Sequence, residues 1–577
     1  MADSPPRQPA LSGHGHGHDH PSPPWRYLAF LRPEAGDMAT IVVYGAVGAV
    51  LALAVPLTVD ALISSIMFGA ILTPLVVLVG ILLGCLLLQA LLRGLQFYVA
   101  EVIERRIFVR VAGDLAWRLP RADVQAFDRC HGPELVNRFF DTVTVQKSSS
   151  KLLVALTNLV LQSGVGLTVL SFYHPLLLYF TLTLLAALAV VVFGFGRGGV
   201  RTAVAQSRTK YEVAAWLQEL ARHTTAFCTA GGMSFARQRT DELCHSYLAA
   251  RRNHFRVWFR QVCATLGLQV LASTAVLGFG GWLVIDQQLT PGQLVASELI
   301  VTAAVANLTK LGEILNVFYD ACAAADKLGH LVDLPLERQN GEDHRPTTRG
   351  AALRLHGVTS NRADSPHALR EFDLEVAAGE RIALVGSPGG VASHLLDVLF
   401  CLREPSGGYV TVDGLDLRQL RLDTLRNEFA LVHGTEIVEG TVLDNLRFGR
   451  SGISPEQVRQ ALDNVGLWDE VLALPQGLDT RLTTRGEPLS SSQASRLMLA
   501  RAILGEPRLL LLDGALDMLT PKVRAHVVEH LFGAQHQWTV LVVTQMPDVV
   551  AACGRRIALE LDDDQGPSRT TGSGGAS

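Results

Sequence analysis

Six runs of mainly apolar residues in the N-terminal half restrict the fold of this chain more than any other feature. Each run is close to the roughly 20 residues that an α-helix needs to cross a bilayer. A chain of 577 residues, 49% of them hydrophobic, has room for these spans and for a further soluble domain. We therefore predict six transmembrane helices, at residues 39–60, 71–92, 152–171, 175–195, 262–285 and 294–315.

The distribution of basic residues predicts how these helices are oriented. The connectors 93–151 and 196–261 are rich in Lys and Arg, whereas the short turns between the other runs contain none. By the positive-inside rule, both long connectors and both termini are cytoplasmic. The sixth run contains Glu298 and Lys310. Glu298 either lines a cavity or lies at the outer edge of the span, and the sequence favours neither position over the other. The expected location is the inner cell membrane.

The two long connectors are predicted to continue the spans as helices into the cytosol. Residues 101–119 and 202–222 mix apolar and charged residues with few helix breakers. Each connector breaks near its middle, around residues 130–133 and 231–232. Two helices joined there would present a blunt tip below the membrane, and the alternative is a plain solvated loop.

The remaining segments complete the predicted domain division. Cysteines are scattered without a C-x-x-C pair, which argues against a disulfide framework or a zinc site. A net charge of −4 gives no indication of a nucleic-acid partner. Alternating histidines in the N-terminal tail leave metal binding there as a second interpretation. The division is a disordered His- and Pro-rich tail at 1–24, the membrane domain at 25–333, a linker at 334–350, an α/β domain at 351–561 and a disordered tail at 562–577.

A glycine-rich stretch in the α/β domain has the context of a phosphate-binding loop. A predicted buried strand at 382–385 leads into it, and an apolar helix at 395–400 follows. In such a loop, backbone N–H groups face phosphate oxygens, and a lysine followed by Ser or Thr contacts the terminal phosphates and magnesium. This chain has Ala392 where the lysine belongs and Val391 where the last glycine belongs. The whole stretch is Gly386, Ser387, Pro388, Gly389, Gly390, Val391, Ala392 and Ser393.

Other strands of this domain are predicted from short apolar runs. Their positions are 353–356, 372–376, 409–412, 509–512 and 539–543, with mostly helix between the strand at 409–412 and residue 504. Further motifs follow in a fixed order. They are VDGLDLRQL at 412–420, GTVLDNLRFG at 440–449, LPQGLDT at 474–480, LSSSQ at 489–493, ARAILGEPRLLLLD at 500–513 and VLVVTQ at 540–545.

With the loop, these motifs resemble the nucleotide-binding domain of ABC transporters. From residue 25 to about 561, the chain resembles an ABC half-subunit of the exporter type. The resemblance implies an α-helical membrane domain with six transmembrane helices and long cytosolic extensions, fused to an α/β P-loop ABC-type nucleotide-binding domain. It also implies a role in ATP-driven transport of an unidentified substrate across the lipid bilayer.

The resemblance further implies which residues handle nucleotide, and most of them are replaced. The glutamine that links magnesium to the membrane domain falls on His433, the catalytic glutamate on Gly514 and the switch histidine on Gln545. The aromatic residue expected to stack on adenine aligns near residues 361–362, where none stands. No catalytic residue is therefore intact.

Some positions of the family pattern remain. Ser393 and Asp513 are candidate magnesium contacts. The signature motif keeps three of its residues and has two serines where the family has glycines. Its positions are Leu489, Ser490, Ser491, Ser492 and Gln493.

These replacements predict a domain that is a poor ATPase. Losing the loop lysine removes a charge-assisted contact of ~1.5–3 kcal/mol and would weaken nucleotide binding roughly 10- to 100-fold. Losing a general base costs about 10²–10⁴ in rate. In the family, each ATP lies between the loop of one subunit and the signature of the other. The favoured hypothesis is therefore a heterodimeric exporter, with ATP and Mg²⁺ bound at a site that a second, ATP-competent half-transporter completes. The alternatives are a non-enzymatic membrane scaffold or regulator and a homodimeric ATP-hydrolysing exporter.

Overall fold

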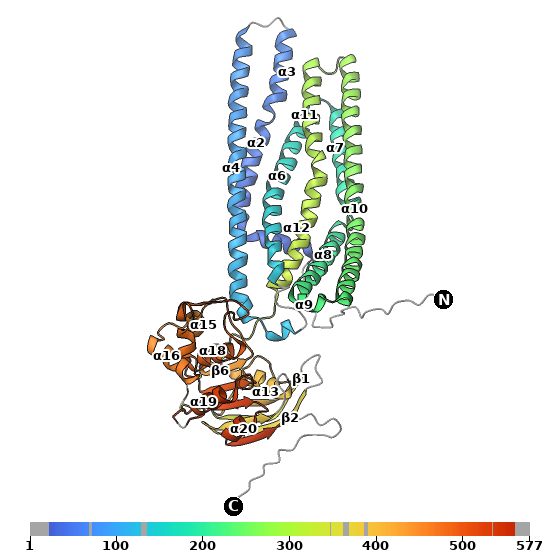
Figure 1. Cartoon of the computed structure of the whole chain (residues 1–577). Helices are drawn as coiled ribbons and strands as arrows, with labels where there is room; N and C mark the ends of the chain where they lie inside the picture. Colours follow the sequence, from blue (N-terminus) through green and yellow to red (C-terminus); the bar gives the residue numbers. More distant parts are fainter. Residues whose placement is uncertain are drawn as a thin grey trace, which may run out of the picture. The chain divides into compact units, whose positions relative to one another are not determined.

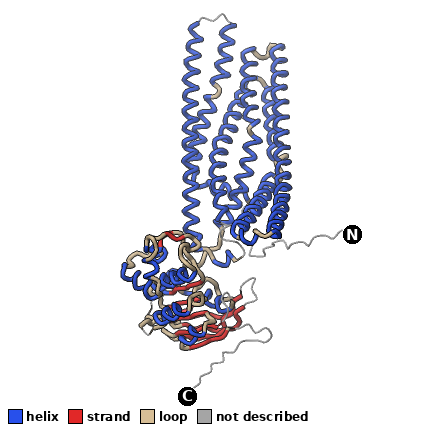
Figure 2. Tube along the Cα trace, in the orientation of Figure 1, coloured by secondary structure: helices blue, strands red, loops and turns tan. Residues whose placement is uncertain are grey.

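A computed structural model describes residues 22–67, 72–128, 136–344, 346, 348–361, 368–385, 390–533 and 535–559. The chain divides into two compact units. The first comprises Met1–Ala122 and Cys130–Pro335, and the second comprises Asp123–Arg129 and Leu336–Ser577. Figure 2 shows that the first unit is built mainly of helices and that the strands gather in the second.

The first unit contains the long helices of the chain (Figure 1). The α-helices of this unit within the described residues, long and short, are α1 (Pro23–Leu31), α2 (Ala35–Leu51), α3 (Ala54–Met67), α4 (Leu72–Arg118), α6 (Asp141–Tyr173), α7 (Pro175–Ala189), α8 (Gly199–Arg222), α9 (Thr224–Phe227), α10 (Ala230–Ile285), α11 (Pro291–Thr309) and α12 (Leu311–Val332).

Five helical stretches among the described residues are long and apolar enough to cross a membrane. They are Pro23–Ile66, Leu75–Arg121, Arg138–Tyr173, Pro175–Arg222 and Ala230–Ile285. The sixth predicted run lies on α11 and the first turn of α12, which are separated only at Lys310. The helices predicted at residues 101–119 and 202–222 are confirmed, because α4 continues to Arg118 and α8 spans Gly199–Arg222.

The break in the second connector lies earlier than the sequence predicts. Helix α8 ends at Arg222 and α10 begins at Ala230, so residues 231–232 belong to the first turn of α10. The side chain of Thr229 accepts a hydrogen bond from the backbone N–H of Gly232 at 3.0 Å and caps the helix. The N-cap threonine, and not the glycine pair, therefore sets the break. The break predicted at residues 130–133 lies outside the described residues.

The second unit contains two main sheets and eight helices among its described residues. The sheets have the strand orders β11-β3-β10-β9-β6, which is parallel, and β2-β1-β4-β5, which is antiparallel. The strands are β1 (Leu353–Asn361), β2 (Ala368–Val376), β3 (Arg381–Val385), β4 (Gly407–Val412), β5 (Leu415–Asp416), β6 (Phe429–His433), β7 (Gly440–Thr441), β8 (Arg481–Leu482), β9 (Leu509–Asp513), β10 (Thr539–Val543) and β11 (Arg555–Ala558). The helices are α13 (Val391–Leu399), α14 (Leu422–Glu428), α15 (Val442–Arg447), α16 (Pro455–Asn464), α17 (Trp468–Leu472), α18 (Ser491–Ile503), α19 (Pro521–Leu531) and α20 (Pro547–Ala552).

Strand β6 corrects the expectation of mostly helix between the strand at 409–412 and residue 504. It pairs in parallel with β9, and His433 lies opposite Asp513 in the register. Strands β9 and β10 are buried along their whole length, as the continuous apolar runs predict. Because the carboxyl ends of parallel strands share one edge of the sheet, this pairing brings two predicted site residues together.

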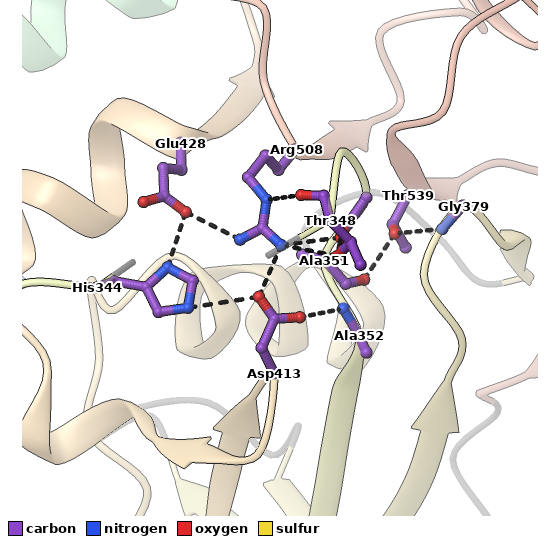
Figure 3. A network of polar contacts seen from close by, with 10 residues as sticks. His344, Thr348, Ala351, Ala352, Gly379, Asp413, Glu428, Arg508 and Thr539 are labelled. Carbon is purple, nitrogen blue, oxygen red and sulfur yellow. Dashed lines mark hydrogen bonds and ion pairs between the residues drawn. The ribbon is translucent and has the colours of Figure 1, made fainter. Parts of the chain in front are cut away.

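A buried polar network holds the amino ends of the same strands (Figure 3). The Arg508 guanidinium donates to Glu428 Oε2 at 3.0 Å and to Asp413 Oδ2 at 2.6 Å. The His344 ring lies between the same two carboxylates, with Nδ1 2.8 Å from Glu428 and Nε2 3.3 Å from Asp413. Glu428 immediately precedes β6 and Arg508 immediately precedes β9. The network therefore fastens the segment around residue 344 to the starts of both strands.

Candidate functional site

The carboxylate of Asp513 lies at the centre of the candidate site. Its side chain is only 2% exposed at the end of β9. Ser393 donates its hydroxyl to Oδ1 at 2.8 Å, and His433 Nδ1 lies 2.7 Å from Oδ2. The Asp513 carboxylate raises the pKa of His433 above its ordinary value, chiefly through this hydrogen bond. Side chains from two other elements, α13 and β6, thus contact the buried acid at the end of β9.

Helix α13 presents Ser393 to this carboxylate. The helix begins at Val391, directly after Gly390, so Ser393 lies in its first turn. Gly386, Ser387, Pro388 and Gly389 lie outside the described residues. The methyl group of Ala392 is 1% exposed and belongs to the apolar core of the unit. Position 392 therefore contributes packing and carries no charge.

The chain turns sharply after Asp513. Gly514 has a φ of 61°, in the left-handed region that favours glycine. Its N–H donates to the Val543 carbonyl at 3.0 Å, and its own carbonyl accepts from the Asp517 N–H at 3.1 Å. Gln545 follows β10 and is exposed. Neither Gly514 nor Gln545 supplies the carboxylate or imidazole that the resemblance assigns to its position.

The signature residues form the start of helix α18. Ser490 is the N-cap, its hydroxyl accepting from the Gln493 N–H at 3.3 Å while the Ser490 N–H donates to Gln493 Oε1 at 2.8 Å. Leu489 is buried, whereas Ser490 and Ser491 are exposed. The first N–H groups of a helix have no acceptor within it, so those of Ser491 and Ser492 remain directed out of its end.

Two further acids support these elements and were not found from the sequence. Gln493 Nε2 and Arg496 Nη2 donate to Glu470 Oε2 at 2.7 and 2.8 Å and fix the first turns of α18. In the same unit, Arg403 makes a two-pronged contact with Asp128, both N···O distances being 2.7 Å. This pair raises the pKa of Arg403 and anchors residues 123–128 to the second unit. Both contacts join residues distant in sequence, which a single sequence does not connect.

The donor set at Asp513 fits one part of a nucleotide site. Carboxylate and hydroxyl oxygens are the ligands that Mg²⁺ prefers, and Asp513 and Ser393 supply one of each. No cation stands at position 392 to balance the terminal phosphates. No group of three or more His, Cys, Asp or Glu side chains suited to a metal occurs within the residues that the structure describes.

Two protein-family models match this chain, one in each of its two units. Residues 38–306 match the ABC transporter transmembrane region, and residues 369–517 match the ABC transporter family. An uncharacterized ABC transporter ATP-binding protein of Bacillus subtilis is 22% identical over 545 residues, which are 93% of this chain and 89% of that protein. The mitochondrial ATP-binding cassette sub-family B member 10 of Mus musculus is 27% identical over 93% of this chain and 76% of its own length.

Other similarities are more partial or concern the fold. An ATP-dependent lipid A-core flippase of Methylococcus capsulatus is 31% identical over 291 residues, 48% of each chain. The solved structure of a bacterial Atm1-family ABC exporter with ATP bound superimposes with a TM-score of 0.78. It covers 92% of this chain and 94% of its own, at 20% sequence identity. The expected architecture, a helical membrane domain followed by an α/β nucleotide-binding domain, is confirmed.

Proposed function

Because the chain belongs to the ABC transporter family, as an exporter-type half-subunit whose transmembrane domain is fused to a nucleotide-binding domain, we propose that it acts beside a second, ATP-competent half in a heterodimeric exporter. A protein of this kind is integral to the membrane, has a cytoplasmic nucleotide-binding domain and uses ATP with Mg²⁺. We place this one in the inner cell membrane with both termini cytoplasmic. Its membrane domain is taken as residues 25–333 and its nucleotide-binding domain as 351–561, joined by the linker 334–350.

The surroundings of Asp513 carry the proposal. Ser393 and Asp513 retain oxygens that would hold magnesium, but the buried methyl of Ala392 offers the phosphates no charge. Gly514 has no side chain with which to take a proton from an attacking water. A site built on the loop of this chain would bind nucleotide weakly and would not hydrolyse it. In a homodimer, both sites would share this deficiency.

The start of α18 supports the role of a partner. The N-terminus of a helix carries partial positive charge and attracts anions. Since the Ser490 hydroxyl and Gln493 are engaged in the capping box, the N–H groups of Ser491 and Ser492 would face the phosphates. We infer that this helix completes a site whose loop lysine, glutamate and histidine come from the second half.

The Arg403–Asp128 pair supports coupling to the membrane domain. Arg403 is 7% exposed, and residues 123–128, which it anchors, lie between α4 and α6 in the sequence. A charge-assisted, two-pronged pair resists displacement better than a single contact does. Movement of the nucleotide-binding domain would therefore pull on the ends of two membrane helices.

ATP turnover by the purified chain tests the proposed inactivity. We expect the full chain, alone in nanodiscs, to hydrolyse ATP no faster than empty nanodiscs. Ser393→Ala and Asp513→Asn are the diagnostic variants, because the first removes the hydroxyl oxygen and the second removes the negative charge of the carboxylate that would hold magnesium. Turnover that is well above background and is lost in either variant would show a working homodimeric ATPase.

Isolation of the native complex tests the heterodimer. The tagged chain, purified at its natural level from its own cells, is expected to bring down one other half-transporter, whose loop lysine and catalytic glutamate are intact. Recovery without any such half would favour a scaffold or regulator. Mixing the two purified halves should then produce turnover that Ser491→Pro in this chain reduces, because proline removes an N–H at the start of α18.

A further inference from the structure

The nucleotide-binding domain contains a cavity of about 560 Å³ at the amino ends of strands β9 and β10. Arg508 immediately precedes β9, Trp538 immediately precedes β10, and both residues line the cavity. Thr348, which Figure 3 shows hydrogen-bonded to Arg508, is part of the same lining. Because the two strands are parallel and Asp513 ends β9, the cavity lies at the opposite edge of the sheet from the candidate nucleotide site.

Two stacked rings contribute to the lining of this cavity. The His536 imidazole lies nearly parallel to the Trp538 indole, with ring centroids 3.9 Å apart and an angle of 7° between the planes. The indole Nε1–H donates to the Leu531 carbonyl at 3.0 Å, which fixes the position of the indole. Burial and the nearby Arg381 guanidinium lower the pKa of His536, so the imidazole is uncharged at neutral pH. The lining therefore includes a flat and uncharged aromatic ring.

Four carboxamide side chains of the lining make no hydrogen bond to any described residue. They are Gln460 and Asn464 on α16 and Gln535 and Gln537 in the segment before β10. Because Gln460 and Asn464 are four residues apart, they lie on the same face of the helix. Each carboxamide has two N–H donors and one acceptor oxygen. The cavity thus offers uncommitted donors and acceptors beside an aromatic ring.

The charged side chains of the lining balance one another. The Arg508 guanidinium is committed to Asp413 and Glu428. Arg349 and Glu506 are both exposed and carry opposite charges. The lining therefore selects a ligand by its shape and hydrogen-bonding groups, and a net charge on the ligand would gain little here.

We propose that this cavity binds the adenine base of a nucleoside or nucleotide, with the base stacked on His536 and its N6 and N7 atoms held by the amides of Gln460 and Asn464. A carboxamide can pair with N6–H and N7 of adenine through two hydrogen bonds. Histidine is among the side chains on which bases stack in proteins. The cavity volume is within the roughly 300–1,000 Å³ of known ligand pockets. This site does not depend on the proposed heterodimer, because it shares no residue with the loop or the signature.

Binding of adenosine to the full chain in nanodiscs, without a partner, tests this proposal. Tritiated adenosine is measured by equilibrium dialysis against empty nanodiscs, and unlabelled adenosine, adenosine monophosphate, 7-deazaadenosine and maltose serve as competitors. Adenosine and its monophosphate should both compete, because both carry the base, and the stronger of the two identifies the source of the base. Maltose should not compete. 7-Deazaadenosine lacks the N7 acceptor and should compete about threefold to tenfold more weakly, as expected for the loss of one hydrogen bond.

Variants locate the bound base. His536→Ala should weaken binding roughly fivefold or more, whereas His536→Phe keeps a flat ring and should preserve binding. Gln460→Ala and Asn464→Ala should each weaken it about threefold to tenfold. Gln460 is exposed and makes no hydrogen bond to a described residue, so its removal leaves the fold undisturbed. His356→Ala is the matched control, because His356 is 66% exposed on β1 of the same domain and does not line the cavity.

Several results would overturn the proposal. They are the absence of adenosine binding, equal competition by maltose or by 7-deazaadenosine, an equal loss in His356→Ala, and unchanged affinity in both Gln460→Ala and His536→Ala, which would place the bound adenosine elsewhere. Each of them leaves the heterodimer proposal intact, because neither ATP turnover nor recovery of the partner depends on this cavity. Conversely, an active homodimer would refute the heterodimer and leave the binding measurement valid.

Discussion

The side-chain contacts at the amino ends of strands β6 and β9 of the nucleotide-binding domain differ from those at their carboxyl ends. At the amino ends, the buried side chains of Arg508 and His344 satisfy two largely buried carboxylates, and each ion pair spans residues distant in sequence. At the carboxyl ends, Asp513 is contacted by Ser393 and His433. The residue before Ser393 is Ala392, whose methyl group is buried, and the residue after Asp513 is Gly514.

This contrast distinguishes residues that stabilise the fold, at the amino ends, from residues at the nucleotide-site positions, at the carboxyl ends. Breaking a buried charge network is costly because it leaves an uncompensated charge, so removing one partner at the amino ends is expected to destabilise the domain. Replacing a phosphate-binding lysine by alanine removes a function while adding an apolar core group. A subunit that a partner needs for its signature helix would experience only the first of these constraints.

The largest expected effect is at the amino ends. Arg508→Met should destabilise the nucleotide-binding domain by about 3–5 kcal/mol, because Asp413 and Glu428, whose side chains are only 15% and 16% exposed, lose their shared cation. Chemical denaturation of the full chain in detergent measures this loss. Arg418→Met is the control, since its pair with Asp416 is exposed and should cost less than about 1 kcal/mol. Equal losses in both would remove the contrast between the ends.

The second effect concerns the carboxyl ends. Ala392→Lys should tighten ATP binding to the isolated chain by roughly 10- to 100-fold, equivalent to ~1.5–3 kcal/mol, because it restores a cation opposite the phosphates. Equilibrium binding of a fluorescent ATP analogue gives the affinity. Ala392→Met is the matched control, with a long stem and no charge. A similar gain in the methionine variant would mean that the charge is not the cause.

A smaller effect is expected at the turn after β9. Gly514→Ala should cost about 1–2 kcal/mol of stability, because a φ of 61° places the new Cβ close to the following carbonyl oxygen. Gly554→Ala should be nearly neutral, since a Cβ at that position would lie 3.9 Å from its nearest neighbour, the Arg381 carbonyl oxygen. Unfolding midpoints of the three chains provide the test. A neutral Gly514→Ala would mean that the turn relaxes, and Gly514→Glu would then be a fair attempt to restore catalysis.

The smallest effect is a pH dependence at His433. Because its folded-state pKa is raised by Asp513, the pair stabilises the fold fully below the ordinary histidine pKa of about 6.5 and loses this contribution as the pH rises through the raised value. His433→Gln should remove that slope. The change should stay below about 1 kcal/mol, since the His433 side chain is 55% exposed and screened by solvent. Melting temperatures across this pH window would show no difference between the two chains if the pair contributes nothing.

Several features of the fold followed from local patterns alone. Apolar runs of bilayer length located the membrane helices, and the continuous runs at β9 and β10 predicted buried strands. Strand β6 was missed because five residues after a helix carry little periodicity of their own and gain their strand geometry by pairing with β9. The helix break near residue 231 was misplaced because glycines were weighted above the Thr229 cap.

Composition and spacing by themselves determined the two-domain architecture, the uncharged residue at position 392 and the glycine at position 514, since each depends only on residue identity along the chain. Tertiary structure decided the neighbours. It placed His433 against Asp513 and joined Arg508 to two distant acids. Such contacts depend on sheet register and helix packing, in which residues far apart in sequence come within a few ångströms of each other.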